Sequence, residues 1–377
     1  MKVLLVVPDL FRNSGGIARY CRLLCKALSE SPQVTVLDVI ALHDSEEMMV
    51  DPDYYDKAKG TYLVASGNLK TFMWQIFRSM TTKKYDFHII CHVNFATFVW
   101  LCSLLARKTA LVLFAYGIEV WERRSYLRRI GMLKADSIFA ISDYTRQNMS
   151  KENDIPLEKI PLLYNCLDPL FLQSTKSNGG GNEASVPIKL KHPNMVTVAR
   201  LSYDDRYKGH ANVIKALSSV SREIADINYY VVGRGDLMGE LKALASELEV
   251  SSHVHFLGFV SEEELISIYK QCDSFVMPSK KEGFGFVFAE AMAYGIPVIA
   301  GNQDASVEVV RDQETGVLVD PDNVEELTAA MLRLLSDAEL RDRMGKAGRV
   351  VVEDEFSFKK FQGVLVNHLQ AHLIQHK

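Results

Sequence analysis

Two carboxylates stand in the stretch KKEGFGFVFAEAMAYGIPVIAG, which runs from residue 280 to residue 301. Glu282 directly precedes a Gly-Phe-Gly turn, and Glu290 follows eight residues later. Such a pair could serve as acid and base, could bind a metal ion, or could be solvated surface. The stretch contains neither histidine nor aspartate, which disfavours a metal site, and phenylalanines between glycines are unusual for a plain surface loop.

The neighbouring elements place both carboxylates. CDSFVMPS (272–279) has the composition of a buried strand, and FVFAEAMAYG (286–295) reads as a helix that Gly295 stops before Pro297. The carboxyl ends of parallel strands face the ligand crevice of an open sheet. We therefore expect Glu282 and Glu290 at that crevice, beside the backbone N–H groups of Phe284 and Gly285.

Two more strand ends in the second half carry polar groups. Arg200 ends the strand NMVTVAR (194–200), and Lys208 follows across a polar loop. An arginine and a lysine at such a place suit a diphosphate, although they could also be ordinary surface charges. Gly233 follows the next strand and could face a nucleotide or simply form a turn.

The first half offers a weaker set of candidates. Asn13-Ser14-Gly15-Gly16 separates a first strand from a first helix, where glycines permit close approach of a phosphate to the helix N-terminus. A tight turn without a ligand explains it as well. His92, Tyr116 and Glu119 follow two further strands and favour a pocket, although a histidine there can also be a core residue.

The pattern of strands and helices indicates an α/β chain with two doubly wound parallel sheets. We predict an N-terminal domain over 1–170 with a C-terminal helix (about 357–377), a linker over 171–187, and a second domain over 188–356. The predicted strands of the first domain are 2–8, 34–40, 87–93, 110–116, 136–142 and 160–165. Those of the second are 194–200, 227–235, 253–260, 272–279, 296–301 and 316–323.

Composition agrees with an ordinary globular protein. The chain has 377 residues, 48% of them hydrophobic, and a net charge of −4, which disfavours nucleic acid as a partner. The six cysteines include no CxxC pair and indicate free thiols in a reducing compartment. The start of the chain does not resemble a signal peptide. The apolar stretch 87–106 contains histidines and is better explained by a strand followed by a helix than by a membrane span.

Two further sequence patterns each have a structural explanation and a functional one. Asp51-Pro-Asp53 and Asp320-Pro-Asp322 could hold a divalent ion, but turn chemistry accounts for both. A basic run is interleaved with aromatic residues and is typical of a solvated helix face. The more specific alternative is a patch that contacts an anionic membrane surface. Its cations are Arg123, Arg124, Arg128, Arg129 and Lys134.

Taken together, these segments resemble family 4 of the retaining glycosyltransferases over nearly the whole chain. The strongest match is Glu282 to Glu290, which resembles the family's E-x7-E motif. Further matches are SGGIAR (14–19), ISDYTRQNM (141–149), YNCLDPLF (164–171) and ARL…KG (199–209). The resemblance implies the GT-B fold, in which two Rossmann-like domains face each other across a cleft.

The resemblance also implies roles for individual residues. Arg200 and Lys208 would bind the donor diphosphate, and Gly15 and Gly16 would cover it with backbone amides. The remaining implied donor contacts come from Gly233, Glu282, Gly283, Phe284, Gly285 and Glu290, with Glu282 facing the transferred sugar and Glu290 accepting from ribose hydroxyls. Tyr116 replaces a histidine common among relatives, and Cys166-Leu167 replaces a usual Gly-Val before Asp168.

The implied reaction is metal-independent transfer of a hexosyl unit from a nucleotide-diphosphate sugar, such as GDP-mannose or a UDP-hexose, to a glycan or lipid-linked hydroxyl. The enzyme would need no cofactor and would work in the cytoplasm, with the inner membrane face as a further expected location. A sugar phosphorylase, a nucleotide-sugar 2-epimerase and a non-catalytic nucleotide-sugar-binding protein remain the alternatives.

Overall fold

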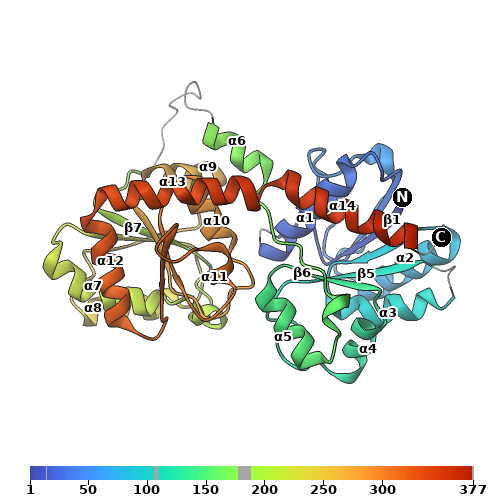
Figure 1. Ribbon diagram of the computed structural model, residues 1–377, viewed down its shortest axis with the longest axis horizontal. Helices are drawn as coiled ribbons and strands as arrows, with labels where there is room; N and C mark the ends of the chain where they lie inside the picture. The colour runs from blue at the N-terminus through green and yellow to red at the C-terminus, as the bar shows by residue number, and fades with distance from the viewer. Residues whose placement is uncertain (14, 106–108, 177–187, 376–377) are drawn as a thin grey trace. The chain divides into compact units, whose positions relative to one another are not determined.

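The computed structural model describes residues 1–13, 15–105, 109–176 and 188–375. The chain forms two compact units, which we describe separately (Figure 1). Unit 1 comprises Met1–Cys166 and Phe358–Lys377, and unit 2 comprises Leu167–Ser357. The predicted linker covers residues 171–187. Its first part, up to residue 176, belongs to a helix, and residues 177–187 lie outside the described residues.

Unit 1 contains a six-stranded parallel sheet in the order β3-β2-β1-β4-β5-β6. Its strands are β1 Lys2–Val7, β2 Val36–Ala41, β3 Tyr62–Val64, β4 Phe87–Ile90, β5 Ala110–Ala115 and β6 Ser137–Ala140. Its helices are α1 Gly16–Glu30, α2 Leu69–Thr82, α3 Val93–Ser103, α4 Tyr126–Lys134, α5 Asp143–Asn153 and α14 Phe358–Gln375. Two short 3₁₀ turns, η1 Lys57–Lys59 and η2 Leu157–Lys159, complete the unit.

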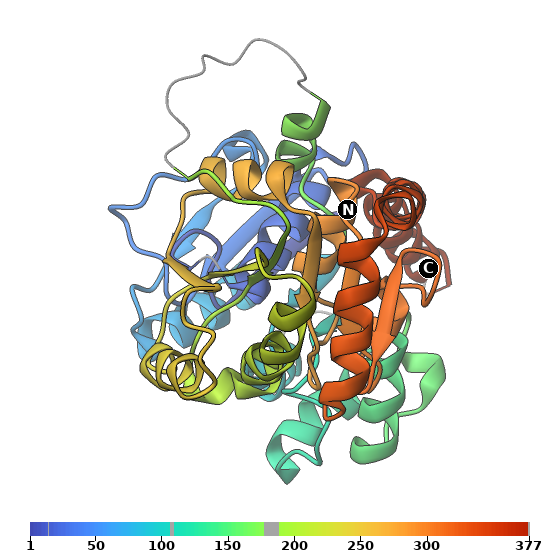
Figure 2. The same cartoon turned by 90° about the vertical axis from the view of Figure 1, so that its left-hand side faces the viewer.

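Unit 2 repeats the plan with the sheet order β12-β11-β10-β7-β8-β9. Its strands are β7 Asn194–Val198, β8 Asn228–Val232, β9 Val254–Gly258, β10 Ser274–Met277, β11 Val298–Gly301 and β12 Gly316–Val319. Its helical elements are α6 Pro169–Lys176, η3 Tyr203–Lys208, α7 His210–Glu223, α8 Met238–Glu247, α9 Glu262–Gln271, α10 Phe286–Ala293, α11 Ser306–Val309, α12 Val324–Ser336 and α13 Ala338–Glu355. Helices α7 and α12 lie side by side on one face of this sheet (Figures 1 and 2).

The central strands are continuous apolar runs because helices cover both faces of each sheet. In β1, all residues from Val3 to Val7 are fully buried. Both sheets are doubly wound: the order in which successive strands are added to the sheet reverses between two neighbouring central strands. These strands are β1 and β4 in unit 1, and β7 and β10 in unit 2. The prediction of two Rossmann-like parallel sheets is therefore confirmed.

One strand prediction was wrong, and one strand was not predicted. The segment 160–165 is not a strand, because it contributes only an isolated bridge between Leu162 and Ala140 at the edge of the sheet. Pro161 lacks an N–H group and cannot extend the ladder. Conversely, the short edge strand β3 was not predicted, since three half-buried residues leave little periodicity to recognise.

The stretch 87–106 begins with a buried strand and continues into a helix, as the sequence predicted. Strand β4 is fully buried, and His88 lies within it at 1% exposure. Over the residues described, no helix combines the length and the apolar content needed to cross a lipid bilayer.

The last helix, α14, packs on α1 within unit 1, as Figure 1 shows in red. The ring of Phe361 meets the ring of Tyr20 edge to face, with centroids 5.5 Å apart. Gln362 donates from Nε2 to the carbonyl of Ala27 at 3.0 Å. Phe356, in contrast, remains in unit 2, where its ring lies 5.1 Å from that of Phe284.

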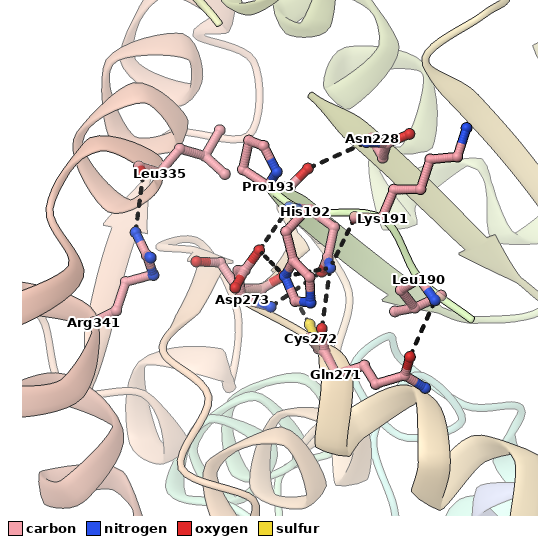
Figure 3. Close-up of polar contacts among 12 residues, drawn as sticks. Leu190, Lys191, His192, Pro193, Asn228, Gln271, Cys272, Asp273, Leu335 and Arg341 are labelled. Atoms are coloured by element: carbon pink, nitrogen blue, oxygen red, sulfur yellow. Dashed lines mark hydrogen bonds and ion pairs between the residues drawn. The ribbon is translucent and has the colours of Figure 1, made fainter. Parts of the chain in front are cut away.

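A polar network fixes the amino ends of β7 and β10 in unit 2 (Figure 3). The carboxylate of Asp273 accepts the backbone N–H of Asn194 at 2.8 Å and lies 2.8 Å from Nδ1 of His192. Gln271 accepts the N–H of Leu190 at 3.1 Å. These bonds set the register of the two central strands, whose carboxyl ends lie at the opposite edge of the sheet.

Candidate functional site

Three of the predicted donor-binding residues of unit 2 lie at the carboxyl ends of β7 and β10. Arg200 and Lys208 follow β7, and Glu282 follows β10. The two strands are hydrogen-bonded neighbours at the point where the strand order reverses. Open α/β sheets bind their ligands at this topological switch point. The fold therefore brings together three side chains that the sequence separates by up to 82 residues.

Lys208 and Glu282 form an ion pair across the switch point. The distance from Nζ to Oε1 is 2.6 Å, and the side chains are only 14% and 13% exposed. Nζ also lies 5.5 Å from the centre of the Tyr207 ring. Burial, followed by the nearby carboxylates of Glu282 and Asp205, raises the pKa of Tyr207. The lysine is thus held in place by a carboxylate and an aromatic face before any ligand binds.

Arg200 presents its guanidinium to solvent from a fixed base. The side chain is 76% exposed, and its Nε lies 3.3 Å from Oδ2 of the buried Asp205. Nη2 donates to Oδ1 of the same carboxylate at 3.3 Å, and Tyr207 donates to that oxygen at 3.1 Å. A planar guanidinium anchored along one side retains donors that can bind a phosphate.

Asp304 orients the loop that carries Glu282. Its Oδ2 accepts the backbone N–H of Glu282 at 2.6 Å, and its Oδ1 accepts that of Ser306 at 2.9 Å. Burial raises the pKa of Asp304 to about 6, against the effect of these hydrogen bonds. Sequence reasoning missed this residue, because GNQDAS after β11 looks like any polar loop and gives no sign of its partner.

The loop ends at a sharp turn into α10. Gly285 adopts φ +86°, which is accessible chiefly to glycine, and a Cβ atom there would lie 2.4 Å from the ring of Phe288. Phe284 anchors the loop through a buried ring that packs on Phe356. Gly283 and Gly285 thus flank an apolar anchor, and the positive end of the helix follows directly.

Glu290 does not lie at the edge of the crevice where the sequence placed it. It is 1% exposed, and its Oε2 accepts from the hydroxyl of Tyr269 at 2.9 Å. The residue lies one turn into α10, and its carboxylate is buried beside the hydroxyl of Tyr269. The implied contact with ribose hydroxyls stays a prediction and requires this carboxylate to change its surroundings.

Gly233 supports the loop of Arg200. It has φ +138°, and a Cβ atom there would lie 1.8 Å from the carbonyl oxygen of Ala199. Hydrogen bonds join the two turns, from Ala199 N–H to Val232 at 2.9 Å and from Leu201 N–H to Arg234 at 3.1 Å. The glycine is required for this close approach of two backbones, which independently explains why it occurs here.

In unit 1, Gly15 and Gly16 are exposed at the start of α1. Gly15 is the N-cap residue and has no side chain to cap the helix, and the described residues of the first turn include no acidic one. Ser14 lies outside the described residues. The arrangement leaves room for an anion at the helix N-terminus, but the role of these glycines towards a donor stays a prediction.

His92 and Tyr116 have structural roles in unit 1. His92 caps α3 by accepting the N–H of Asn94 at Nδ1, and burial together with Arg128 lowers its pKa to about 4. Tyr116 is buried, with its hydroxyl 3.6 Å from Sγ of Cys21. The hydroxyl expected in a sugar pocket therefore faces the core of the unit.

Glu119 closes the turn after β5. Its carboxylate accepts the backbone N–H of Tyr116. Burial raises the pKa of Glu119, while backbone hydrogen bonds and Arg124 act in the opposite direction. The residue orders the loop between β5 and the basic run, and its proposed contact with a substrate remains untested.

Three of the four arginines of the basic run contact groups within unit 1. Arg123 and Arg129 both contact the carboxylate of Asp154. Arg124 donates to the backbone carbonyls of Ile118 and Glu122 at 3.2 Å. Arg128 is exposed and faces no carboxylate among the described residues. A membrane contact made equally by all four arginines is therefore disfavoured.

Both Asp-Pro-Asp segments are turns. Asp51 accepts the N–H of Asp53, and Asp320 accepts that of Asp322, each at 2.9 Å. These bonds are the Asx turns that the sequence favoured over a metal site. Within the described ranges, no group of three histidine, cysteine or acidic side chains has the arrangement of a metal centre.

Comparisons with known proteins agree with this architecture. The family described as "Glycosyltransferase Family 4" matches residues 14–170, and "Glycosyl transferases group 1" matches residues 182–351. A GDP-mannose-dependent alpha-(1-6)-phosphatidylinositol monomannoside mannosyltransferase of Mycobacterium tuberculosis is 30% identical over 279 residues, 71% of each chain.

Solved structures share the fold over almost the whole chain. A glycosyltransferase from Rickettsia africae has a TM-score of 0.80 and 18% identity, covering 99% of this chain and 98% of that one. Anabaena HepE in complex with UDP has a TM-score of 0.76 and 19% identity, covering 98% and 100%. The chain therefore has the GT-B fold and belongs to family 4 of the glycosyltransferases.

Proposed function

We propose that the protein is a retaining glycosyltransferase that moves a hexosyl unit from a nucleotide-diphosphate sugar to an acceptor hydroxyl. The observation that carries the proposal is the triad of Arg200, Lys208 and Glu282 at the switch point of unit 2. It offers two cations for a diphosphate and one carboxylate for a neighbouring sugar. Membership of family 4 supports this use of the residues.

The chemistry requires stabilisation of charge on the leaving phosphate as the glycosidic bond breaks. An exposed guanidinium, an ammonium group and the N-terminus of α10 can supply it without a metal ion. We expect the leaving phosphate to accept the acceptor's proton on the same face of the sugar. A double displacement would instead need a carboxylate nucleophile close to the anomeric carbon.

The ion pair suggests how the donor enters. A diphosphate that approaches Lys208 competes with Glu282 for the ammonium group, whose distance to the carboxylate is only 2.6 Å. Once displaced, Glu282 becomes an acceptor for sugar hydroxyls, held through its backbone by Asp304. The pair thus keeps both groups desolvated and oriented in advance, which lowers the cost of arranging them during binding.

GDP-mannose is our first choice of donor, because the mycobacterial relative is described as GDP-mannose-dependent. A UDP-hexose is the second, because a structural neighbour was solved with UDP. We propose a glycan or lipid-linked hydroxyl as acceptor, since the same relative is named for a phosphatidylinositol monomannoside. The enzyme would then work in the cytoplasm at the inner membrane face, with Arg128 and the exposed Tyr126 and Leu127 of α4 as contacts.

The deciding experiment has two stages. Thermal stability measured with GDP, UDP and ADP, and with their sugars, selects the donor, because a ligand that binds the native state raises the melting temperature. Transfer from that donor to a lipid-linked or glycan acceptor is then followed by NMR at the anomeric proton. Retention of configuration and full activity in EDTA are expected. Inversion, strict dependence on added Mn²⁺, or conversion of the donor without acceptor would contradict the proposal.

A further inference from the structure

A hollow of about 680 Å³ lies in unit 1 at the amino ends of the strands. Its walls come from the starts of β1 and β2 and from the segments that lead into β3 and β4. In unit 1, the predicted pocket residues His92, Tyr116 and Glu119 follow the carboxyl ends of β4 and β5, so this hollow lies at the opposite edge of the same sheet. Its volume falls within the roughly 300–1,000 Å³ typical of small-molecule sites.

The charge of the hollow is strongly one-sided. Its lining includes five lysines and a single carboxylate, that of Asp38. The lysines are Lys2, Lys57, Lys59, Lys83 and Lys84. They come from three segments separated in sequence, and the fold gathers them around one concavity. Concave surfaces lined by one sign of charge concentrate ions of the opposite sign.

The carboxylate of Asp38 accepts hydrogen bonds from within the protein. It is 3% exposed and accepts from Nζ of Lys83 at 2.7 Å, from the hydroxyl of Tyr85 at 2.6 Å, and from the N–H and hydroxyl of Thr61, each at 2.7 Å. Although burial alone would raise its pKa, these bonds lower it, so the carboxylate stays ionised. Asp38 therefore neutralises Lys83 and holds the floor of the hollow in place.

The other lysines are not neutralised in this way. Lys59 donates to the carbonyl of Ser31 at 2.8 Å, which carries no formal charge. No carboxylate among the described residues pairs with Lys2, Lys57 or Lys84. The nearby Asp56 and Asp86 are used by backbone N–H groups, of Ala58 and Lys2 respectively. Four lysine ammonium groups around the hollow thus form no ion pair with a carboxylate among the described residues, although the carboxylates of Asp56 and Asp86 lie close by.

We propose that this hollow is a second anion site, which binds a compact ligand carrying more than one phosphate. Lysine ammonium groups bind phosphate as point charges, and several around one concavity match a multiply charged ligand better than a single carboxylate. Two sources share this chemistry, a soluble phosphorylated molecule and the head group of an anionic phospholipid. The site is separate from the donor-binding triad, which lies entirely in unit 2.

The test uses inorganic pyrophosphate and calorimetric titration of the full chain. Arg200→Ala/Lys208→Ala is the background, so that binding at the triad does not contribute. In this background, Lys57→Gln/Lys84→Gln should weaken pyrophosphate binding by at least about tenfold, because two charged contacts are lost. The matched control, Lys151→Gln/Lys346→Gln, removes the same charge from exposed lysines elsewhere and should change binding less than about twofold.

Vesicle flotation distinguishes the two sources. Phosphatidylcholine vesicles with added cardiolipin, whose head group carries two phosphates, should bind the protein through Lys57 and Lys84 if the ligand is a lipid head group, even if pyrophosphate binds poorly. Pyrophosphate binding without flotation identifies a soluble ligand. If the background protein binds neither, or if Lys57→Gln/Lys84→Gln binds as well as the control, the proposal is wrong.

Discussion

Nζ of Lys208 and Oε1 of Glu282 lie 2.6 Å apart, although 74 residues separate them in the chain. Each follows one of the two central strands of unit 2, and each is largely shielded from water. A shielded pair depends on both of its members, because the removal of one leaves a charge without a partner. The pair therefore couples the stability of the second unit to the state of its site.

Glu282→Gln should separate binding from transfer. In this variant, nucleotide binding no longer has to break an ion pair at Lys208, so GDP or UDP should bind up to about tenfold more tightly. The rate of sugar transfer should fall. Calorimetry and a transfer assay measure the two effects.

The same pair makes a prediction about stability. Lys208→Gln and Glu282→Gln should each lower the free energy of unfolding by about 2 kcal/mol, and Lys208→Gln/Glu282→Gln should lower it by less than the sum. Additive losses and unchanged nucleotide binding would refute this account of the pair.

Arg200→Ala should lower kcat/KM by on the order of 10²–10³-fold, because one stabilising donor for the leaving phosphate is lost. The variant should stay folded but lose roughly 1–3 kcal/mol in urea unfolding, because the buried carboxylate of Asp205 loses its cation. Arg206→Ala is the matched control, since Arg206 is an exposed arginine of the same loop that pairs with Glu240. Equal kinetic losses in both variants would remove Arg200 from the site.

Much of this site followed from the sequence. Arg200, Lys208 and Glu282 stand directly after recognisable buried strands, and parallel sheets place such positions together. Glu290 is more deeply buried than we expected, because helical position alone does not tell which face of α10 turns towards Tyr269. Asp304 was invisible because its function is to accept a backbone N–H group from a loop 22 residues away. Tyr116 looked like a pocket residue because strand ends do not reveal side-chain direction.

Asp304 predicts a pH dependence of stability. Its pKa in the folded protein, about 6, lies above the ordinary value, so between about pH 4 and pH 6 the folded state holds a proton that the unfolded chain has released. The free energy of unfolding should therefore fall as the pH rises through this window, by roughly 2–3 kcal/mol from this group. Urea unfolding of the wild type and of Asp304→Asn across the window measures the difference.

The Asn variant should be less stable at every pH, because it loses one of two acceptors for backbone N–H groups. Only the slope of its stability against pH identifies the titration. Parallel curves for the two proteins would assign the pH dependence to other groups.

Gly285→Ala should destabilise the protein by about 2 kcal/mol, because alanine is strained at positive φ and its Cβ would meet the ring of Phe288. Gly239→Ala in α8 is the control, since no atom lies within 4 Å of a Cβ there and alanine favours helices. Thermal unfolding of both variants checks the contrast. A Gly285 variant as stable as the control would mean that this turn is not fixed.

The return of α14 to Tyr20 makes unit 2 an insertion between two pieces of unit 1. On the ribosome, every residue of unit 2 emerges before the final helix does. Unit 2 can therefore finish folding while unit 1 still exposes the apolar face of α1. Unit 1 is thus synthesised first but completed last. Removal of α14 would destabilise a unit whose other residues lie at the opposite end of the sequence.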